Sequence, residues 1–165
     1  MRSIAQGALI AAVLILAASM ASAADIRVLS VSAAHSAVQA LAVEFKKDTG
    51  HEVALTLGSP SEVMEKIKAG EIFDALIASE GAMDELDRDG IVNPESRLRL
   101  ASGNESGTDA PPAGQANPQP SKIVYEGALM SDGAAPEAAR AFILFLGSAD
   151  ARSAWVAAKL EPAQQ

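Results

Sequence analysis

The chain has 165 residues, a formal net charge of −8 and no cysteine. Its length is enough for one domain with a sizeable core, and its acidic balance argues against nucleic acid and anionic membranes as partners. Without cysteine, disulfides and thiolate metal sites are excluded, and the two histidines give little basis for a metal centre or a cofactor.

The first 23 residues have the pattern of a secretory signal. Arg2 precedes an apolar run from Gly7 to Ala18, and Ala21-Ser22-Ala23 supplies the small residues of a cleavage site. A membrane anchor is the weaker alternative, because the apolar run is short for a bilayer crossing. We therefore expect residues 1–23 to be removed before Ala24 on export to the periplasm.

Residues 24–100 alternate between strand and helix patterns. Apolar runs predict strands at 26–31, 52–57 and 74–79, and apolar stripes predict helices at 34–47 and 61–69 and a short acidic helix ending at Gly90. This order predicts an α/β fold with a mostly parallel sheet and helices on both faces. Ligands of such sheets bind beyond the carboxyl ends of the strands.

Residues 101–121 interrupt this pattern. They are rich in Gly, Pro, Asn and Ser and almost lack large apolar residues, so we expect a flexible linker here. Residues 122–165 then return to order, with a strand at 122–130, a helix from Pro136 and a last helix capped by Ser148. We interpret them as the completion of the same domain.

The stretch "LGSPSEV", residues 57–63, lies where an α/β protein often binds an anion. Ser59 followed by Pro60 and Glu62 is the signature of a capping box, with Ser59 as the N-cap and proline at the first helical position. The carboxylate of Glu62 would then occupy the positive end of the helix dipole, where a bound anion would otherwise lie. The sequence therefore predicts a turn that is capped by its own side chains.

Several stretches, in their order, resemble the molybdate-binding proteins of bacterial ABC transporters, which are type II periplasmic solute-binding proteins. These stretches are "IRVLSVSAAHSAVQALAVEFKKDTGHEV", "GSPSEVMEKIKAGEIFDALIAS", "GIVNPESRLRLA" and "PEAARAFILFLGSADARSAWVAAKLEP". The resemblance implies a single lobe of such a protein. The second lobe is expected to be missing, with residues 101–121 in its place.

The resemblance also implies where an oxyanion would bind. The family uses a serine in each of the first two strand–helix turns, and without gaps these fall at Ala33 and Pro60 of this chain. A shift of one residue would bring in neighbouring hydroxyls instead, so the candidate ligand-binding residues are Ser32, Ala33, Ser59, Pro60 and Ser61. His35 is either an ordinary residue at a helix start or a pH-dependent contact to an anion.

The expected function is a periplasmic solute-binding protein of the molybdate type with weak or lost binding of molybdate, tungstate or sulfate. An ABC permease is the implied partner. The alternative is a non-transport interaction module that forms a homodimer or binds another exported protein. We expect no enzyme, because the sequence contains no G-x-S-x-G elbow, P-loop or H-E-x-x-H motif. Asp74 and Tyr125 are expected to serve structure, and His51 to lie at the surface.

Overall fold

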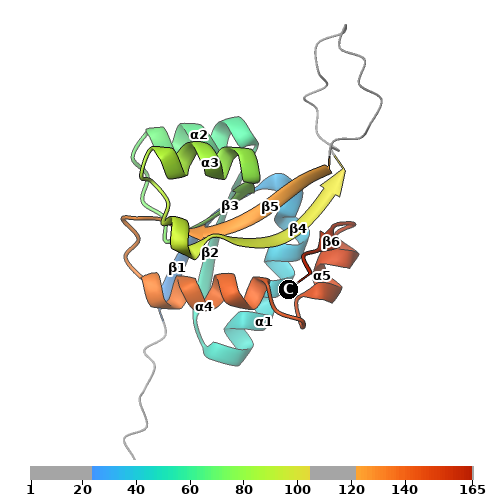
Figure 1. Cartoon of the computed structure of the whole chain (residues 1–165). Helices are drawn as coiled ribbons and strands as arrows, with labels where there is room; N and C mark the ends of the chain where they lie inside the picture. Colours follow the sequence, from blue (N-terminus) through green and yellow to red (C-terminus); the bar gives the residue numbers. More distant parts are fainter. Residues whose placement is uncertain (1–23, 105–121, 165) are drawn as a thin grey trace, which may run out of the picture.

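A six-stranded sheet organises residues 24–104 and 122–164, the parts of the chain that the computed structural model describes (Figure 1). Its strand order is β2-β1-β3-β5-β4-β6. The strands are β1 (Asp25–Val31), β2 (Glu52–Gly58), β3 (Ala75–Ser79), β4 (Leu98–Asn104), β5 (Lys122–Leu129) and β6 (Glu161–Pro162). The predicted secretory signal, residues 1–23, lies outside the described residues.

The first half of the sheet is parallel, as the sequence pattern predicts. β1 pairs in parallel with β2 on one side and β3 on the other, so that Val28 lies between Leu55 and Ala75. The predicted ranges of these three strands agree with the structure to within one residue. Most residues of β1 and β3 are buried, which is typical of a parallel sheet covered on both faces.

The second half of the sheet is antiparallel. β5 lies between β3 and β4 and runs opposite to both, and β6 adds a short antiparallel pair at the outer side of β4. The α/β class with helices on both faces is confirmed. Its parallel part is confined to β2, β1 and β3, because β5 runs antiparallel to both β3 and β4.

Helices cover the two faces of the sheet in separate groups (Figure 1). α2 (Pro60–Lys68) and α3 (Glu80–Arg88) lie on one face, and α1 (His35–Thr49), α4 (Pro136–Leu146) and α5 (Arg152–Ala157) lie on the other. The apolar faces of α1 and α4 are buried, and Phe45 of α1 contacts Phe142 of α4 with ring centroids 5.1 Å apart. The core is thus built from both halves of the chain.

The predicted linker begins too early. Ala101 to Asn104 form the second half of β4 and pair with β5, ending at Asn104 opposite Lys122. Ala101 and Gly103 are buried, and a Cβ on Gly103 would approach Leu160 Cδ2 to 2.4 Å. These small residues are therefore strand positions packed against the C-terminal segment. The rest of the predicted linker, residues 105–121, lies outside the described residues.

Asp74 has a structural role, as predicted from the sequence. Its buried carboxylate accepts hydrogen bonds from the backbone N–H groups of Arg27, at 2.7 Å, and Ala135, at 2.8 Å. It thereby joins β1 to the residue before α4. His51 differs from the prediction, because it is half-buried and its ring stacks on Phe45. Tyr125 is buried, as expected.

Candidate functional site

Three strand–helix turns meet at the carboxyl edge of the parallel strands. After β1 the chain makes a 3-10 turn at Ser32–Ala34 and enters α1, after β2 it enters α2 through Ser59, and after β3 it enters α3 through Ser79. Adjacent strands place the first turn between the other two. The predicted binding residues Ser32, Ala33, Ser59, Pro60 and Ser61 are thus brought together on two neighbouring turns.

The start of α2 is capped as the sequence predicts. The backbone N–H of Ser59 donates to Glu62 Oε2 at 2.7 Å, and the backbone N–H of Glu62 donates to Ser59 Oγ at 3.3 Å. Pro60 occupies the first helical position and offers no N–H. The hydrogen bond from the Ser59 backbone lowers the pKa of Glu62, and the Ser59 side chain and Lys66 act in the same direction. The Glu62 carboxylate therefore occupies the N-terminal end of α2, where a bound anion would otherwise lie.

The start of α1 is different. Neither the 3-10 turn nor α1 has a side-chain cap or an acidic residue in its first turn. Ser32 Oγ, however, donates to the backbone carbonyl of Gly58 at 3.0 Å, which links the first turn to the second. A serine hydroxyl has one proton to donate, so in this arrangement Ser32 cannot also donate to an oxyanion. Ala33 is exposed and has no hydroxyl.

The third turn carries a charge pair that was not predicted from the sequence. Glu80, the first residue of α3, accepts a hydrogen bond from Arg99 Nη2 of β4 at 2.6 Å. This bond raises the pKa of Arg99, with a smaller contribution from Glu126. Two of the three helix starts at this edge therefore bear a glutamate, at Glu62 and Glu80. Only tertiary pairing between strands brings Arg99 to this position, so local patterns could not reveal it.

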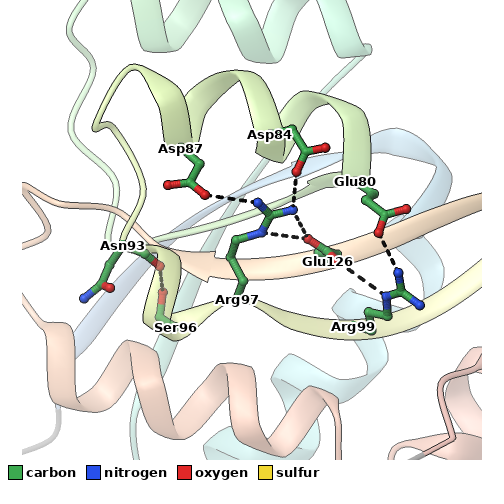
Figure 2. Close-up of polar contacts among 8 residues, drawn as sticks. All are labelled: Glu80, Asp84, Asp87, Asn93, Ser96, Arg97, Arg99 and Glu126. Carbon is green, nitrogen blue, oxygen red and sulfur yellow. Dashed lines mark hydrogen bonds and ion pairs between the residues drawn. The ribbon is translucent and has the colours of Figure 1, made fainter.

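A larger ionic cluster lies beside this pair, between α3 and the strands (Figure 2). Arg97 donates to Glu126 at 2.7 and 3.0 Å, to Asp84 at 2.8 Å and to Asp87 at 3.2 Å. We call these four residues the Arg97 cluster. The hydrogen bonds to Asp84 and then Glu126 raise the pKa of Arg97, so its charge is fixed. Because each acid is paired with it, the cluster holds α3 on β5.

The chemistry available at the carboxyl edge is limited. In residues 24–104 and 122–164 no three His, Cys, Asp or Glu side chains are grouped so as to hold a metal ion. Ser59 and Ser61 are exposed, and Ser61 lies on the first turn of α2. His35 is half-buried at the start of α1, which places it near the predicted turns. A hollow of about 560 Å³ lies at the opposite edge, around Leu129 and Met130.

Comparison with known proteins gives the class of this fold. Residues 26–105 match a family described as "Bacterial extracellular solute-binding protein". The fold is that of a lobe of a periplasmic binding protein. Within the described ranges, no helix is long and apolar enough to cross a membrane.

Three solved structures illustrate the likeness. The periplasmic molybdate-binding protein of Azotobacter vinelandii has a TM-score of 0.71 at 17% identity, covering 84% of this chain and 100% of its own. A substrate-binding domain assigned to a molybdenum ABC transporter of Clostridium difficile has a TM-score of 0.70 at 12% identity, covering 86% and 100%. The sulfate-binding protein SubI of Mycobacterium tuberculosis has a TM-score of 0.64 at 11% identity, covering 86% and 88%. At these identities the likeness establishes the fold alone.

Proposed function

We propose that the chain is a periplasmic solute-binding protein of the molybdate type, reduced to one lobe, whose oxyanion binding is weak or lost. The observation that carries this proposal is the capping box at α2. There, the Glu62 carboxylate accepts the backbone N–H of Ser59 at 2.7 Å and occupies the helix end. An incoming oxyanion would have to displace this carboxylate or bind beside its charge.

The count of hydrogen-bond donors supports the same conclusion. Molybdate and sulfate carry only acceptor oxygens, so their site must supply N–H or O–H groups. Ala33 and Pro60 offer no hydroxyl, Pro60 also lacks an N–H, and the Ser32 proton is donated to Gly58 O. The donors that remain on these two turns include the exposed hydroxyls of Ser59 and Ser61 and the amides at the start of α1. On an open lobe, water competes with each of these bonds.

Isothermal titration of residues 24–165 with molybdate, tungstate and sulfate tests the proposal. We expect no measurable affinity, or a Kd no tighter than about millimolar, because the few remaining donors stay hydrated. Micromolar or tighter binding of any of these anions would contradict the loss of binding. It would leave the assignment to the solute-binding class intact.

A variant of the two turns tests whether the self-capped turn is responsible. Ala33→Ser, Pro60→Ser and Glu62→Ala together add two hydroxyls, restore one amide and remove the competing carboxylate. We expect this variant to bind molybdate or sulfate with a Kd of about millimolar, seen as amide chemical-shift changes at 32–36 and 58–63. As a control, Glu65→Ala removes an exposed acid of α2 outside the cap. Equal responses of variant and parent would show that the missing lobe, and not the turn, sets the affinity.

A second candidate function is an interaction module that forms a homodimer through the edge of the sheet. Within residues 24–104 and 122–164, β2 pairs with β1 alone, and one side of its backbone is left to accept another strand. Residues Val53 to Leu57 carry no charge, and Val53 and Leu55 are only partly buried. A second copy of β2, running antiparallel, would satisfy this edge symmetrically.

Light scattering on the purified protein decides between the two candidates. A dimer that becomes monomeric in Ala54→Lys would support the module, because a lysine on an edge strand opposes strand addition. The matched control is Ala40→Lys, which puts the same charge on an exposed position of α1. A protein that stays monomeric at high concentration excludes the module and leaves the solute-binding proposal.

A further inference from the structure

The first described residue is fixed by a histidine from a distant part of the chain. The backbone N–H of Ala24 donates to Nδ1 of His51 at 2.9 Å. On its other side, the carbonyl of Ala24 accepts from the backbone N–H of Glu52 at 3.2 Å. Ala24 is thus held at both ends although it precedes β1.

The imidazole of His51 is itself held in place. Its ring stacks on Phe45, with ring centroids 5.9 Å apart and an interplanar angle of 23°. The backbone N–H of His51 donates to Thr49 Oγ1 at 3.2 Å, which fixes the loop between α1 and β2. Since Nδ1 accepts a hydrogen bond from the Ala24 N–H, this nitrogen carries no proton, and a neutral ring carries its proton on Nε2.

We propose that His51 is the docking site for the N-terminus that signal cleavage creates. When water splits the Ala23–Ala24 peptide bond, the hydroxyl joins the Ala23 carbonyl carbon and a hydrogen joins the Ala24 nitrogen. The new amine takes up a further proton near neutral pH and becomes an ammonium group. It keeps an N–H directed at His51 Nδ1, and the hydrogen bond becomes charge-assisted.

The neighbouring charges are compatible with this docking. The side chain of Asp25 is exposed, and the Glu52 carboxylate is paired with Lys46 at 2.8 Å. His51 Nδ1 is therefore the acceptor that the Ala24 nitrogen contacts. Cleavage before Ala24 therefore creates the N-terminus that this hydrogen bond to His51 stabilises. It rests on export and cleavage, and it does not depend on anion binding.

Intact-mass analysis of the protein recovered from the periplasm gives the first test. We expect a chain that begins at Ala24. A different first residue would overturn the proposal, because the ammonium group would then lie elsewhere.

A two-by-two comparison gives the second test. Proteins that begin at Ala24 or at Asp25 are prepared with either His51 or His51→Phe, which retains an aromatic ring but removes the acceptor. With His51, loss of Ala24 should lower the Tm by about 4 °C, in line with one charge-assisted hydrogen bond in a domain of this size. With His51→Phe, the same deletion should lower the Tm clearly less, because only the hydrogen bond between the Glu52 N–H and the Ala24 carbonyl is then lost. Equal losses in both backgrounds would overturn the proposal.

Nitrogen NMR of the imidazoles covers the case in which His51→Phe does not fold. In the protein that begins at Ala24, His51 should show an unprotonated Nδ1, and its ring signals should shift when Ala24 is removed. His35, the other histidine, serves as an internal control whose signals should not move. A protonated Nδ1 on a neutral His51 ring, or no shift, would contradict the docking.

Discussion

Glu62 is the residue whose charge most directly decides the properties of the candidate site. The Ser59 backbone hydrogen bond lowers the pKa of Glu62 below its ordinary value of 4.5. A carboxylate with a lowered folded-state pKa stabilises the protein above its unfolded-state pKa, and this contribution is lost as the pH falls through the folded-state pKa. The ionised form is therefore the one that caps α2.

This linkage predicts a pH-dependent effect of Glu62→Ala. At pH 7 the variant should be less stable than the parent, because α2 loses a cap partner. Below about pH 4 the difference should shrink, since the parent carboxyl is then increasingly protonated. Urea unfolding of both proteins from pH 7 to pH 3 measures it, with Glu65→Ala as the control. A difference that stays constant over this range would mean that the carboxylate does not cap α2.

At the scale of elements, the Arg97 cluster decides how α3 is attached to the sheet (Figure 2). Arg97→Met removes the positive charge and leaves the buried Glu126, whose side chain is 7% exposed, without its main partner. We expect a loss of about 3 kcal/mol in unfolding free energy, as for other broken ion pairs with a buried member. Adding Glu126→Gln should recover part of that loss. If the double variant is as unstable as the sum of the two single variants, the pairing is not the cause.

The β4–β5 pair gives a prediction about the segment between the strands. Asn104 and Lys122 lie opposite each other at its end, so a short Gly/Ser turn can connect them. We propose that residues 105–121 contribute nothing to stability, and that replacing them by such a turn leaves the Tm nearly unchanged. Replacement of 101–121 is the control and should lower the Tm strongly, because Ala101 is buried within β4. Equal melting of both deletions would contradict the role of β4.

Local patterns were sufficient for some elements and not for others. The helix at 60–68 was predictable because Ser59, Pro60 and Glu62 are adjacent in sequence and cap it together. The end of β4 was not predictable, because small residues there resemble a linker until Leu160 is known to pack against Gly103.

For the molecule as a whole, the candidate site was also only partly predictable from local patterns. Sequence order and apolar patterning were enough to predict that the first three strands are parallel and that the turns after them lie at their carboxyl ends. The strand order β2-β1-β3 came from the structure. The hydrogen bond from Ser32 to Gly58 and the pairing of Arg99 with Glu80 depend on which strands become neighbours. The two partners of each contact are far apart in the sequence, and no local pattern links them. Both contacts therefore became visible only in the structure.

The position of β5 between β3 and β4 has a consequence for how the protein is made. β5 is synthesised after both of its neighbours, yet it lies between them in the finished sheet. In a growing chain that ends at Asn104, the strand that pairs with both β3 and β4 is therefore not yet present. Phe45 also still lacks its contact with Phe142. Such a chain cannot close its core before synthesis is nearly complete. We therefore expect a nascent polypeptide that ends at Asn104 to remain unfolded, and to fold only once β5 and α4 have been added.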